Sequence, residues 1–384
     1  MNFDLTSDQK MMKETAASFV KKSSPVERMR KLRDDARGWD PAIYKQMGEL
    51  GWLGLPLPEA AGGLGGSMFD AGLVLEQLGS TLVPEPFIPS IVLGGMAIAQ
   101  AGNSEQQGRF LAPVIEGDRS LALAYAERQS RYDLCDVATR ADKSGDGWSL
   151  GGEKVFVLNG HAADHLVVAA RTSGDSRDAQ GISLFVIDRD APGLTIRSIK
   201  TMDGARAASL ELAGVKAGKD RLLGAEGEGL AVLEHVIDKA AAATCAEGVG
   251  ISQRVLWMTV EYLKTRKQFD VPIGVFQALQ HRTVDMFVQV ELLKSTSILA
   301  CAKADSTDVA ERQHAVSVAK ARLASGGFHV VAQGTQLHGG IGVTDEHDIS
   351  LYFKRMRVLN GRFGDEDFHV ARFASLPRFT EGVS

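Results

Sequence analysis

Two short stretches carry residue types that could bind a phosphate-bearing ligand. Residues 262–280 contain Arg266, whose guanidinium is a planar fork of donors that can pair with phosphate oxygens. Residues 336–342 contain Gly339 and Gly340, which let the backbone approach a ligand where no side chain could. By themselves, these features are also typical of a solvated charge and of a helix C-cap. His338 is predicted to be structural, because no second histidine lies at metal-ligand spacing.

The composition excludes several classes of protein. A formal net charge of -5 and a pI of about 6.0 argue against binding of the whole chain to nucleic acid. The three cysteines, Cys135, Cys245 and Cys301, are far apart, so neither a disulfide framework nor a zinc site is expected. The N-terminal residues lack a basic region followed by an apolar run, and no apolar segment is long enough to span a membrane. These features predict a cytoplasmic protein with no membrane span.

Three segments with different patterns of apolar residues follow one another, and they predict an α+β fold in three domains. Residues 1–118 have the apolar spacing of amphipathic helices, and Thr6 is placed to cap the first of them. Residues 119–224 contain short β-type runs separated by turn signals, which predicts a small antiparallel β-barrel. Residues 225–384 return to long helices with the spacing of a four-helix bundle.

Individual elements can be placed within these domains. The strands are expected at residues 121–125, 148–150, 154–158, 165–170 and 182–187, and later helices at 277–304, 308–337 and 348–357. The glycine-rich run Gly62–Gly66 is expected to be a loop. It is a weak nucleotide-binding signal, because no strand precedes it.

The two stretches and the domain order resemble the acyl-CoA dehydrogenase family. Residues 262–280 are similar to its pattern of a tyrosine, an arginine, a glutamine-phenylalanine-glycine turn and a phenylalanine-glutamine pair. Residues 336–342 look like its QxxGGxG loop, and the likeness extends from Phe3 to Arg372. The resemblance implies the acyl-CoA dehydrogenase fold, FAD as cofactor, and α,β-dehydrogenation of an acyl-CoA thioester.

The resemblance also implies cofactor-binding residues and partners. In the family, the residues that Arg266 and Phe269 match meet FAD from a neighbouring subunit. Those that Phe276 and Gln277 match lie near its adenine end. The predicted cofactor-binding residues are Arg266, Gln268, Phe269, Phe276, Gln277, Gln336, Leu337, Gly339 and Gly340. The implied partners are an acyl-CoA substrate, electron-transfer flavoprotein as electron acceptor, and an acyl-CoA dehydrogenase-type subunit in a homo- or hetero-oligomer.

The catalytic glutamate of the family is missing from both positions where its members carry it. In the family reaction, this carboxylate takes a proton from the α-carbon while a hydride passes from the β-carbon to flavin N5. Phe363 occupies one position and Ala240 the other. The sequence therefore assigns no catalytic residue. The nearby acids are predicted to be solvated charges, and Asp365 lies nearest to the expected place: Asp365, Glu366, Asp367, Glu234 and Asp238.

The loop that would hold the flavin ring departs from the family as well. Residues 127–139 keep the spacing of the family's flavin loop, but Ala126 lacks the hydroxyl that would bond the ring. Tyr132 replaces a small serine, and Leu158 replaces a threonine that hydrogen-bonds near flavin N5. Hydroxyl contacts are thus missing on both strands, while the motifs that face a neighbouring subunit remain.

These departures suggest that the chain lends its motifs to a neighbour's flavin. The run Glu127–Leu134 and the tail Phe363–Asp365 most resemble the small subunit of pimeloyl-CoA dehydrogenase-type two-subunit enzymes. An active enzyme with a relocated base, another flavin reaction, and a catalytically silent structural partner stay open as alternatives. Three arginines could meet an acyl carboxylate or a CoA phosphate but are also typical of surface charges: Arg128, Arg131 and Arg206.

Overall fold

The computed structural model describes residues 4–377; the first three residues of the N-terminus and residues 378–384 lie outside the described residues. The chain divides into two compact units. We call one the bundle unit, which combines Met1–Lys31, Met68–Val83 and Ala241–Ser384. We call the other the sheet unit, which combines Leu32–Ser67 and Pro84–Ala240.

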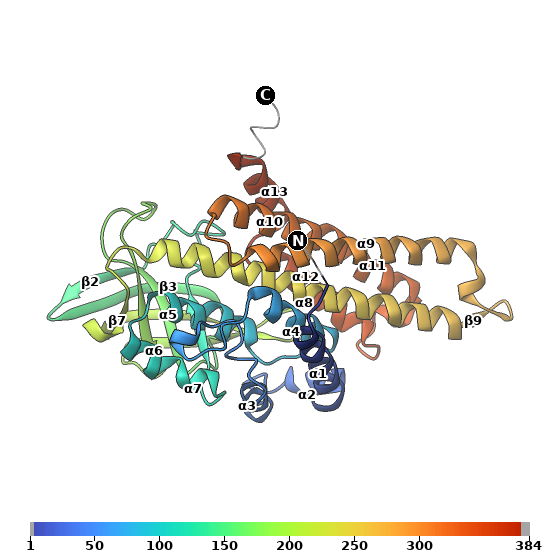
Figure 1. The fold of residues 1–384 in the computed structure, drawn as a ribbon, viewed down its shortest axis with the longest axis horizontal. Helices are drawn as coiled ribbons and strands as arrows, with labels where there is room; N and C mark the ends of the chain where they lie inside the picture. Colours follow the sequence, from blue (N-terminus) through green and yellow to red (C-terminus); the bar gives the residue numbers. More distant parts are fainter. Residues whose placement is uncertain (1–3, 378–384) are drawn as a thin grey trace. The chain divides into compact units, whose positions relative to one another are not determined.

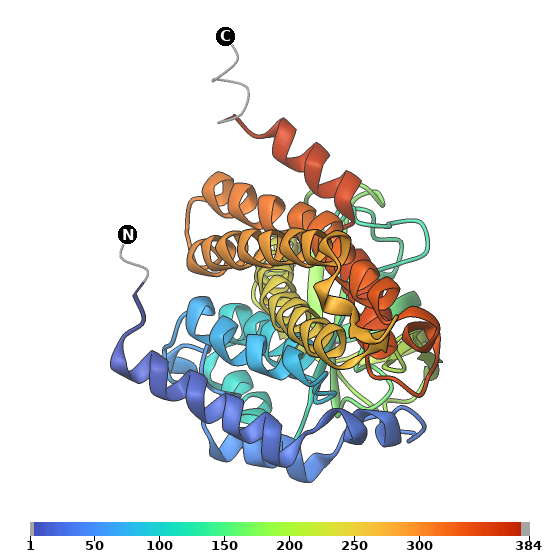
Figure 2. The same cartoon turned by 90° about the vertical axis from the view of Figure 1, so that its right-hand side faces the viewer.

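Long helices build the bundle unit. Thr6 caps the first of them as predicted, in a reciprocal pair of hydrogen bonds with Gln9. Helix α9 packs against α10, α11 and α4, and Figures 1 and 2 show α9 and α10 side by side. The helices are α1 (Ser7–Ser23), α2 (Val26–Leu32), α4 (Met68–Ser80), α8 (Gly229–Thr265), α9 (Gln277–Lys303), α10 (Val309–Arg322), α11 (Phe328–Leu337), α12 (Ile349–Gly361) and α13 (Glu366–Ser375), and α2 and α8 contribute residues to both units.

The single helix expected at 308–337 is interrupted. A π-helical turn, Leu323–Gly327, separates α10 from α11. Glycine destabilises a regular helix, and this turn contains Gly326 and Gly327. A Cβ on Gly327 would lie 3.0 Å from the sulfur of Met356 on α12, so the glycine allows the two helices to approach closely. The period of the apolar residues does not reveal such a turn.

A second close approach joins α4 to α8. A Cβ on Gly250 of α8 would lie 1.8 Å from the carbonyl oxygen of Glu76 on α4. A Cβ on Gly79 of α4 would lie 2.2 Å from the carbonyl oxygen of Glu247 on α8. The two helices therefore pack backbone against backbone, which only glycine permits at these positions.

The sheet unit contains one large sheet and shorter helices. The strands are β1 (Leu121–Ala124), β2 (Arg140–Ser144), β3 (Gly147–Leu158), β4 (His165–Arg171), β5 (Ile182–Asp188), β6 (Leu194–Lys200), β7 (Arg206–Ala217) and β8 (Leu222–Leu223). The helices are α3 (Pro41–Glu49), α5 (Met96–Ala101), α6 (Ser104–Phe110), α7 (Ala112–Ile115) and the π-helical η2 (Ile88–Gly95). Trp148, Phe185 and Leu210 belong to the buried core on one face of the sheet. The expected loop at Gly62–Gly66 lies between the 3₁₀ turn Glu59–Ala61 and α4.

The α+β class is confirmed, with three corrections to the sheet. Its strand order is β6-β7-β3-β2-β4-β5-β8, with β1 beside β4, so the described strands form an open path rather than a closed barrel. Most neighbours are antiparallel, but β4 pairs in parallel with both β1 and β2. The two runs expected at 148–150 and 154–158 are one strand, β3, with irregular register against β7. No helix in the described part of the chain is long and apolar enough to cross a membrane.

We predict that Gly250→Ala lowers the free energy of unfolding by about 1–3 kcal/mol, because its methyl group would overlap the backbone of α4. Gly108→Ala is the matched control. Gly108 is an exposed position of α6 whose Cβ would meet nothing within 4 Å, so alanine should stabilise the protein by about 0.5–1 kcal/mol. Thermal or urea unfolding measures both, and equal effects of the two changes would contradict the close approach of α4 and α8.

Candidate functional site

A pocket of about 510 Å³ lies in the bundle unit, and we call it the bundle-end pocket. Six of the nine predicted cofactor-binding residues line it: Arg266, Gln268, Gln336, Leu337, Gly339 and Gly340. The other lining residues are Tyr262, Ile273, Leu279, Arg282, His338 and Ile341. Two segments separated by about seventy positions in the sequence therefore meet at one cavity. The other three predicted residues, Phe269, Phe276 and Gln277, do not line it.

A tight hairpin forms one border of the bundle-end pocket. Helix α8 ends at Thr265, and the two-residue strands β9 (Lys267–Gln268) and β10 (Val271–Pro272) pair antiparallel (Figure 1). Phe269 and Asp270 at the turn have φ angles of 52° and 63°, a conformation that disfavours non-glycine residues. The turn leaves Phe269 85% exposed, with its ring 6.1 Å from that of Phe276. Gln277 begins α9.

The two glycines leave their side of the pocket open. Gly339 has a φ of 65°, and a Cβ on either Gly339 or Gly340 would meet nothing within 4 Å. Gly342 differs, because its Cβ would lie 2.3 Å from the carbonyl oxygen of Thr335. Packing of the protein therefore requires glycine at 342 but not at 340. The free space at Gly340 would admit a ligand close to the backbone.

Two rings pack against that of His338, the residue that precedes the glycine loop. The ring of His338 lies 4.4 Å from that of Tyr262 and 4.6 Å from that of His347. Burial lowers the pKa of His338 and favours its neutral form. Its Nδ1 donates to the carbonyl oxygen of Gly334 over 2.7 Å. His338 thus braces the end of α11 and occupies a structural position.

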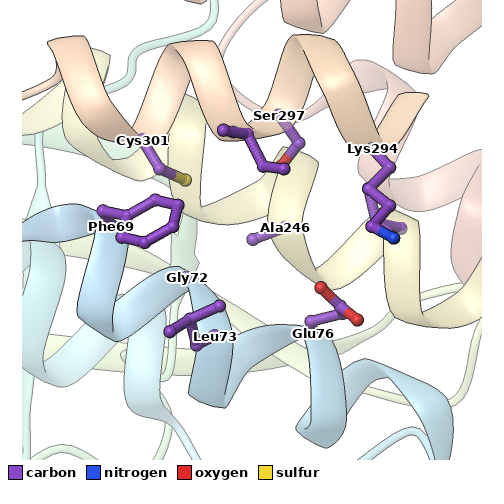
Figure 3. A pocket seen from close by; sticks show the side chains of 10 residues that line it. Phe69, Gly72, Leu73, Glu76, Ala246, Lys294, Ser297 and Cys301 are labelled. Carbon is purple, nitrogen blue, oxygen red and sulfur yellow. The ribbon is translucent and has the colours of Figure 1, made fainter. Parts of the chain in front are cut away.

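A second cavity in the bundle unit is too small for a cofactor. It measures about 20 Å³, enough for roughly one water molecule. Figure 3 shows Lys294, Ser297 and Cys301 of α9 facing Leu73 and Glu76 of α4 across it. Glu76 already has a cation, since Lys13 Nζ lies 3.0 Å from its carboxylate. This cavity is a gap in helix packing.

The first position predicted for the family's base is occupied by Phe363, whose side chain cannot accept a proton. Phe363 is 6% exposed with a φ of 60°, and His369 Nε2 donates to its carbonyl oxygen over 3.0 Å. Burial, followed by the charges of Arg372 and Lys320, lowers the pKa of His369 to about 3, so this imidazole is neutral. Asp365 caps α13, accepting a hydrogen bond from the backbone N–H of Phe368 over 3.0 Å.

The second position, on α8, also lacks a base. Ala240 is fully buried and its methyl group cannot take a proton. Asp238 is 2% exposed, so the expectation that it is a solvated charge is wrong. Its place on the buried side of a helix cannot be told from a single charged residue in the sequence. Glu366 and Asp367 are exposed, as expected.

The loop of residues 127–139 in the sheet unit is held by a buried ion pair. Lys154 Nζ lies 2.6 Å from the carboxylate of Glu127, and the two side chains are 0% and 5% exposed. The same carboxylate accepts from the backbone N–H groups of Ala138 and Thr139, at 2.8 and 3.1 Å. Burial raises the pKa of Glu127, but the charge of Lys154 and the hydrogen bonds from Lys154, Gln129 and Thr139 outweigh it and hold the pKa below its usual range.

A buried arginine fixes the other end of this loop. Arg171 is 0% exposed and donates to five carbonyl oxygens, those of Cys135, Val137, Ser176, Asp178 and Gln180. The loop backbone is therefore ordered, although Ala126 and Leu158 supply no hydroxyl group. Arg131 and Phe156 have φ angles of 45° and 52°, so each takes a conformation that glycine would adopt more easily.

Three models of one protein family together match most of the chain. Residues 6–118 match the acyl-CoA dehydrogenase N-terminal domain, residues 122–215 the middle domain and residues 227–375 the C-terminal domain. The chain is 32% identical to acyl-CoA dehydrogenase IpdE2 of Mycobacterium tuberculosis, over 91% of this chain and 90% of that protein. It belongs to the acyl-CoA dehydrogenase family. FAD is accordingly the cofactor of the chain, and its activity belongs with the oxidoreductases.

Solved structures that are similar in sequence share its fold. The Tcur3481-Tcur3483 steroid ACAD is 31% identical, with a TM-score of 0.86 and 98% of both chains covered. The ChsE4-ChsE5 complex from Mycobacterium tuberculosis is 27% identical, with a TM-score of 0.87, and the match covers 97% of this chain and 98% of that one. Both structures are named for a pair of proteins.

The residues present fit one part of FAD better than the other. The bundle-end pocket offers Arg266, the amides of Gln268 and Gln336, and the open glycine corner, which suit a phosphate-bearing group. In the sheet unit, Ala126 and Leu158 offer no side-chain donor to a flavin ring.

Arg282 and Leu279 also line the bundle-end pocket, but they belong to no recognised motif. They lie three residues apart on one face of α9, and this spacing is the only feature of the sequence that indicates that they could line the same pocket.

We predict that Gly340→Ala weakens FAD binding without destabilising the fold, because its methyl group would project into space left for a ligand. Gly342→Ala should instead lower the melting temperature, since its methyl group would overlap the backbone of Thr335. Fluorescence titration with FAD and thermal unfolding separate the two effects. Unchanged FAD affinity in Gly340→Ala would argue against close approach of the cofactor at this corner.

We predict that Lys154→Met lowers the free energy of unfolding by about 3–5 kcal/mol at pH 7, because Glu127 would remain buried without its cation. The folded-state pKa of Glu127 lies below its ordinary value of 4.5, so its ionised form stabilises the protein above that pH. This contribution is lost as the pH falls through the folded-state pKa. The difference between wild type and variant in urea unfolding should therefore shrink at acidic pH. A difference that grows there would contradict the assignment.

Proposed function

We propose that this chain is the base-lacking subunit of a heteromeric FAD-dependent acyl-CoA dehydrogenase. It would contribute its bundle-end pocket to an FAD site and require a homologous subunit for α,β-dehydrogenation of an acyl-CoA thioester. The observation that carries the proposal is the hydrophobic residue at each position of the base. Phe363 is buried, and its carbonyl oxygen is bonded to a neutral His369.

The chemistry requires a partner for a simple reason. A base must remove the α-proton as the β-hydride leaves, so that two electrons and two hydrogens depart and a C=C bond forms. Neither Phe363 nor Ala240 has an atom that accepts a proton. Bound FAD would supply hydride acceptance at the flavin ring. This chain's own residues would bind and orient the phosphate-bearing part of the cofactor.

The relatives support a heteromeric assembly. Among the similar structures, the ChsE4-ChsE5 complex and the Tcur3481-Tcur3483 steroid ACAD each carry two protein names. A steroid side chain is therefore one acyl group to test, together with fatty and dicarboxylic acyl chains. The resemblance to the small subunit of pimeloyl-CoA dehydrogenase-type enzymes favours the same kind of assembly.

We propose that all nine predicted cofactor-binding residues contact FAD and that the chain has three domains, residues 1–118, 119–224 and 225–384. We also propose that electron-transfer flavoprotein is the electron acceptor and that the protein is cytoplasmic. The exposed Phe269 on its strained hairpin is suited to meet a group on a neighbouring subunit, which supports its place in the set.

A catalytically silent structural partner is the second candidate. The loss of hydroxyl groups at Ala126 and Leu158 favours it, because the chain's own flavin loop would then have no cofactor to bond. Retention of FAD by the purified chain would count against this candidate. The relocated base is less favoured, because Asp365 serves as the N-cap of α13.

We predict that the chain purified alone is not bleached anaerobically by a panel of fatty, dicarboxylic and steroid side-chain acyl-CoAs after loading with FAD. Bleaching should appear when a homologous base-containing subunit is co-purified. Stoichiometric bleaching of the isolated chain would overturn the proposal.

Two variants of Asp365 test the relocated base directly. Asp365→Asn keeps a competent cap and removes the carboxylate, whereas Asp365→Ala removes the cap and should destabilise the protein by about 1 kcal/mol. Neither should change the flavin response to acyl-CoA. If the wild type is bleached and Asp365→Asn is not, Asp365 is the base.

A further inference from the structure

The bundle-end pocket contains a second arginine that no motif identifies. Its lining includes two guanidinium groups, those of Arg266 and Arg282, and two carboxamides, those of Gln268 and Gln336. No aspartate or glutamate is among its lining residues. The pocket is therefore locally positive in a chain whose formal net charge is -5. That charge pattern suits an anionic ligand with more than one negative charge.

Arg282 is held in place without a counter-ion. Its Nε donates to the side-chain oxygen of Gln333 on α11 over 2.7 Å. The side chain is half-buried, and within residues 4–377 Arg282 forms no ion pair. Since Nε is bound to Gln333, the two terminal nitrogens of the guanidinium remain for a ligand. These two nitrogens could donate to a bound anion without first breaking an ion pair.

The two arginines reach the pocket from different helices. Arg266 follows the end of α8, whereas Arg282 lies in the second turn of α9. Gln333, which orients Arg282, lies on the helix that leads into Gly339 and Gly340. The Arg282–Gln333 hydrogen bond thus connects α9 to the helix that precedes Gly339 and Gly340, where the backbone is open to a ligand.

We infer that Arg282 is a second phosphate-binding residue of this pocket, so that Arg266 and Arg282 together take the diphosphate of a nucleotide cofactor. Gln333 is the positioning residue that holds the guanidinium of Arg282. A diphosphate carries two negative charges, and two guanidinium groups can pair with both of them. The inference rests on the proposed role of this pocket in binding FAD.

The simpler interpretation is that the Arg282–Gln333 hydrogen bond only ties α9 to α11. The two interpretations differ in what they predict for binding. A structural tie would change unfolding and leave affinity for a nucleotide unchanged in a folded variant. A phosphate contact would change affinity, and a lysine that keeps the charge would restore part of it.

The test titrates the full-length chain with FAD and, separately, with ADP, by calorimetry at low and high salt. We expect Arg282→Gln to weaken both affinities by roughly tenfold to a hundredfold, as for loss of a hydrogen bond to a charged group. Arg282→Lys should fall between this variant and wild type, and Gln333→Ala should weaken binding less than Arg282→Gln. The affinity lost in Arg282→Gln should be smaller at high salt. Thermal unfolding of each variant confirms that it is folded.

Two controls separate the possible failures. Lys264→Gln removes a cation from the last turn of α8 that is paired with Glu261 and does not line the pocket, and it should leave both affinities unchanged. If Arg266→Gln weakens binding and Arg282→Gln does not, Arg282 is only a structural tie and the inference is overturned. If the wild-type chain takes up neither ADP nor FAD, the role of the pocket fails together with the inference. Either result is distinct from a failure to bleach, which concerns the base.

Discussion

A buried cation stabilises each end of the loop that follows β1, and the sheet unit depends on this constraint. Lys154 neutralises Glu127, whose carboxylate also collects two backbone N–H groups. Arg171 donates to five carbonyl oxygens and so holds the segment around Val137 against the segment around Asp178. Unpaired polar groups in a protein interior are costly, so loss of either cation would release the loop.

This network explains how the loop can be ordered without the hydroxyl contacts that the resemblance predicts for a flavin ring. The backbone is held by charges behind it rather than by the residues that would face a flavin ring. Ala126 and Leu158 carry no hydroxyl group, and the loop is ordered without one at either position. Phe363 is similar: His369 donates a hydrogen bond to its backbone carbonyl oxygen, while its side chain has no group that could act as a base.

In the bundle unit, by contrast, groups that could contact a ligand are present. Gly339 and Gly340 keep free space that packing does not require, and Arg266 and Arg282 keep their positive charge without a carboxylate in the pocket lining. These features of the pocket support the proposed contribution of this chain to a cofactor site.

The sequence by itself determined the α+β class, the family and the core of the pocket, because hydrophobic periodicity and two glycine- and arginine-containing motifs are local properties. The tertiary structure alone decided which residues share a cavity. Arg282 joins Arg266 because α9 returns beside the glycine loop, whereas Phe269 is turned outwards by a strained hairpin. The π-helical turn at Leu323–Gly327, the open sheet and the buried Asp238 were likewise beyond the sequence, since each depends on packing between segments distant along the chain. The residue types in a segment indicate which secondary structure it can form, whereas tertiary packing determines which distant residues it contacts.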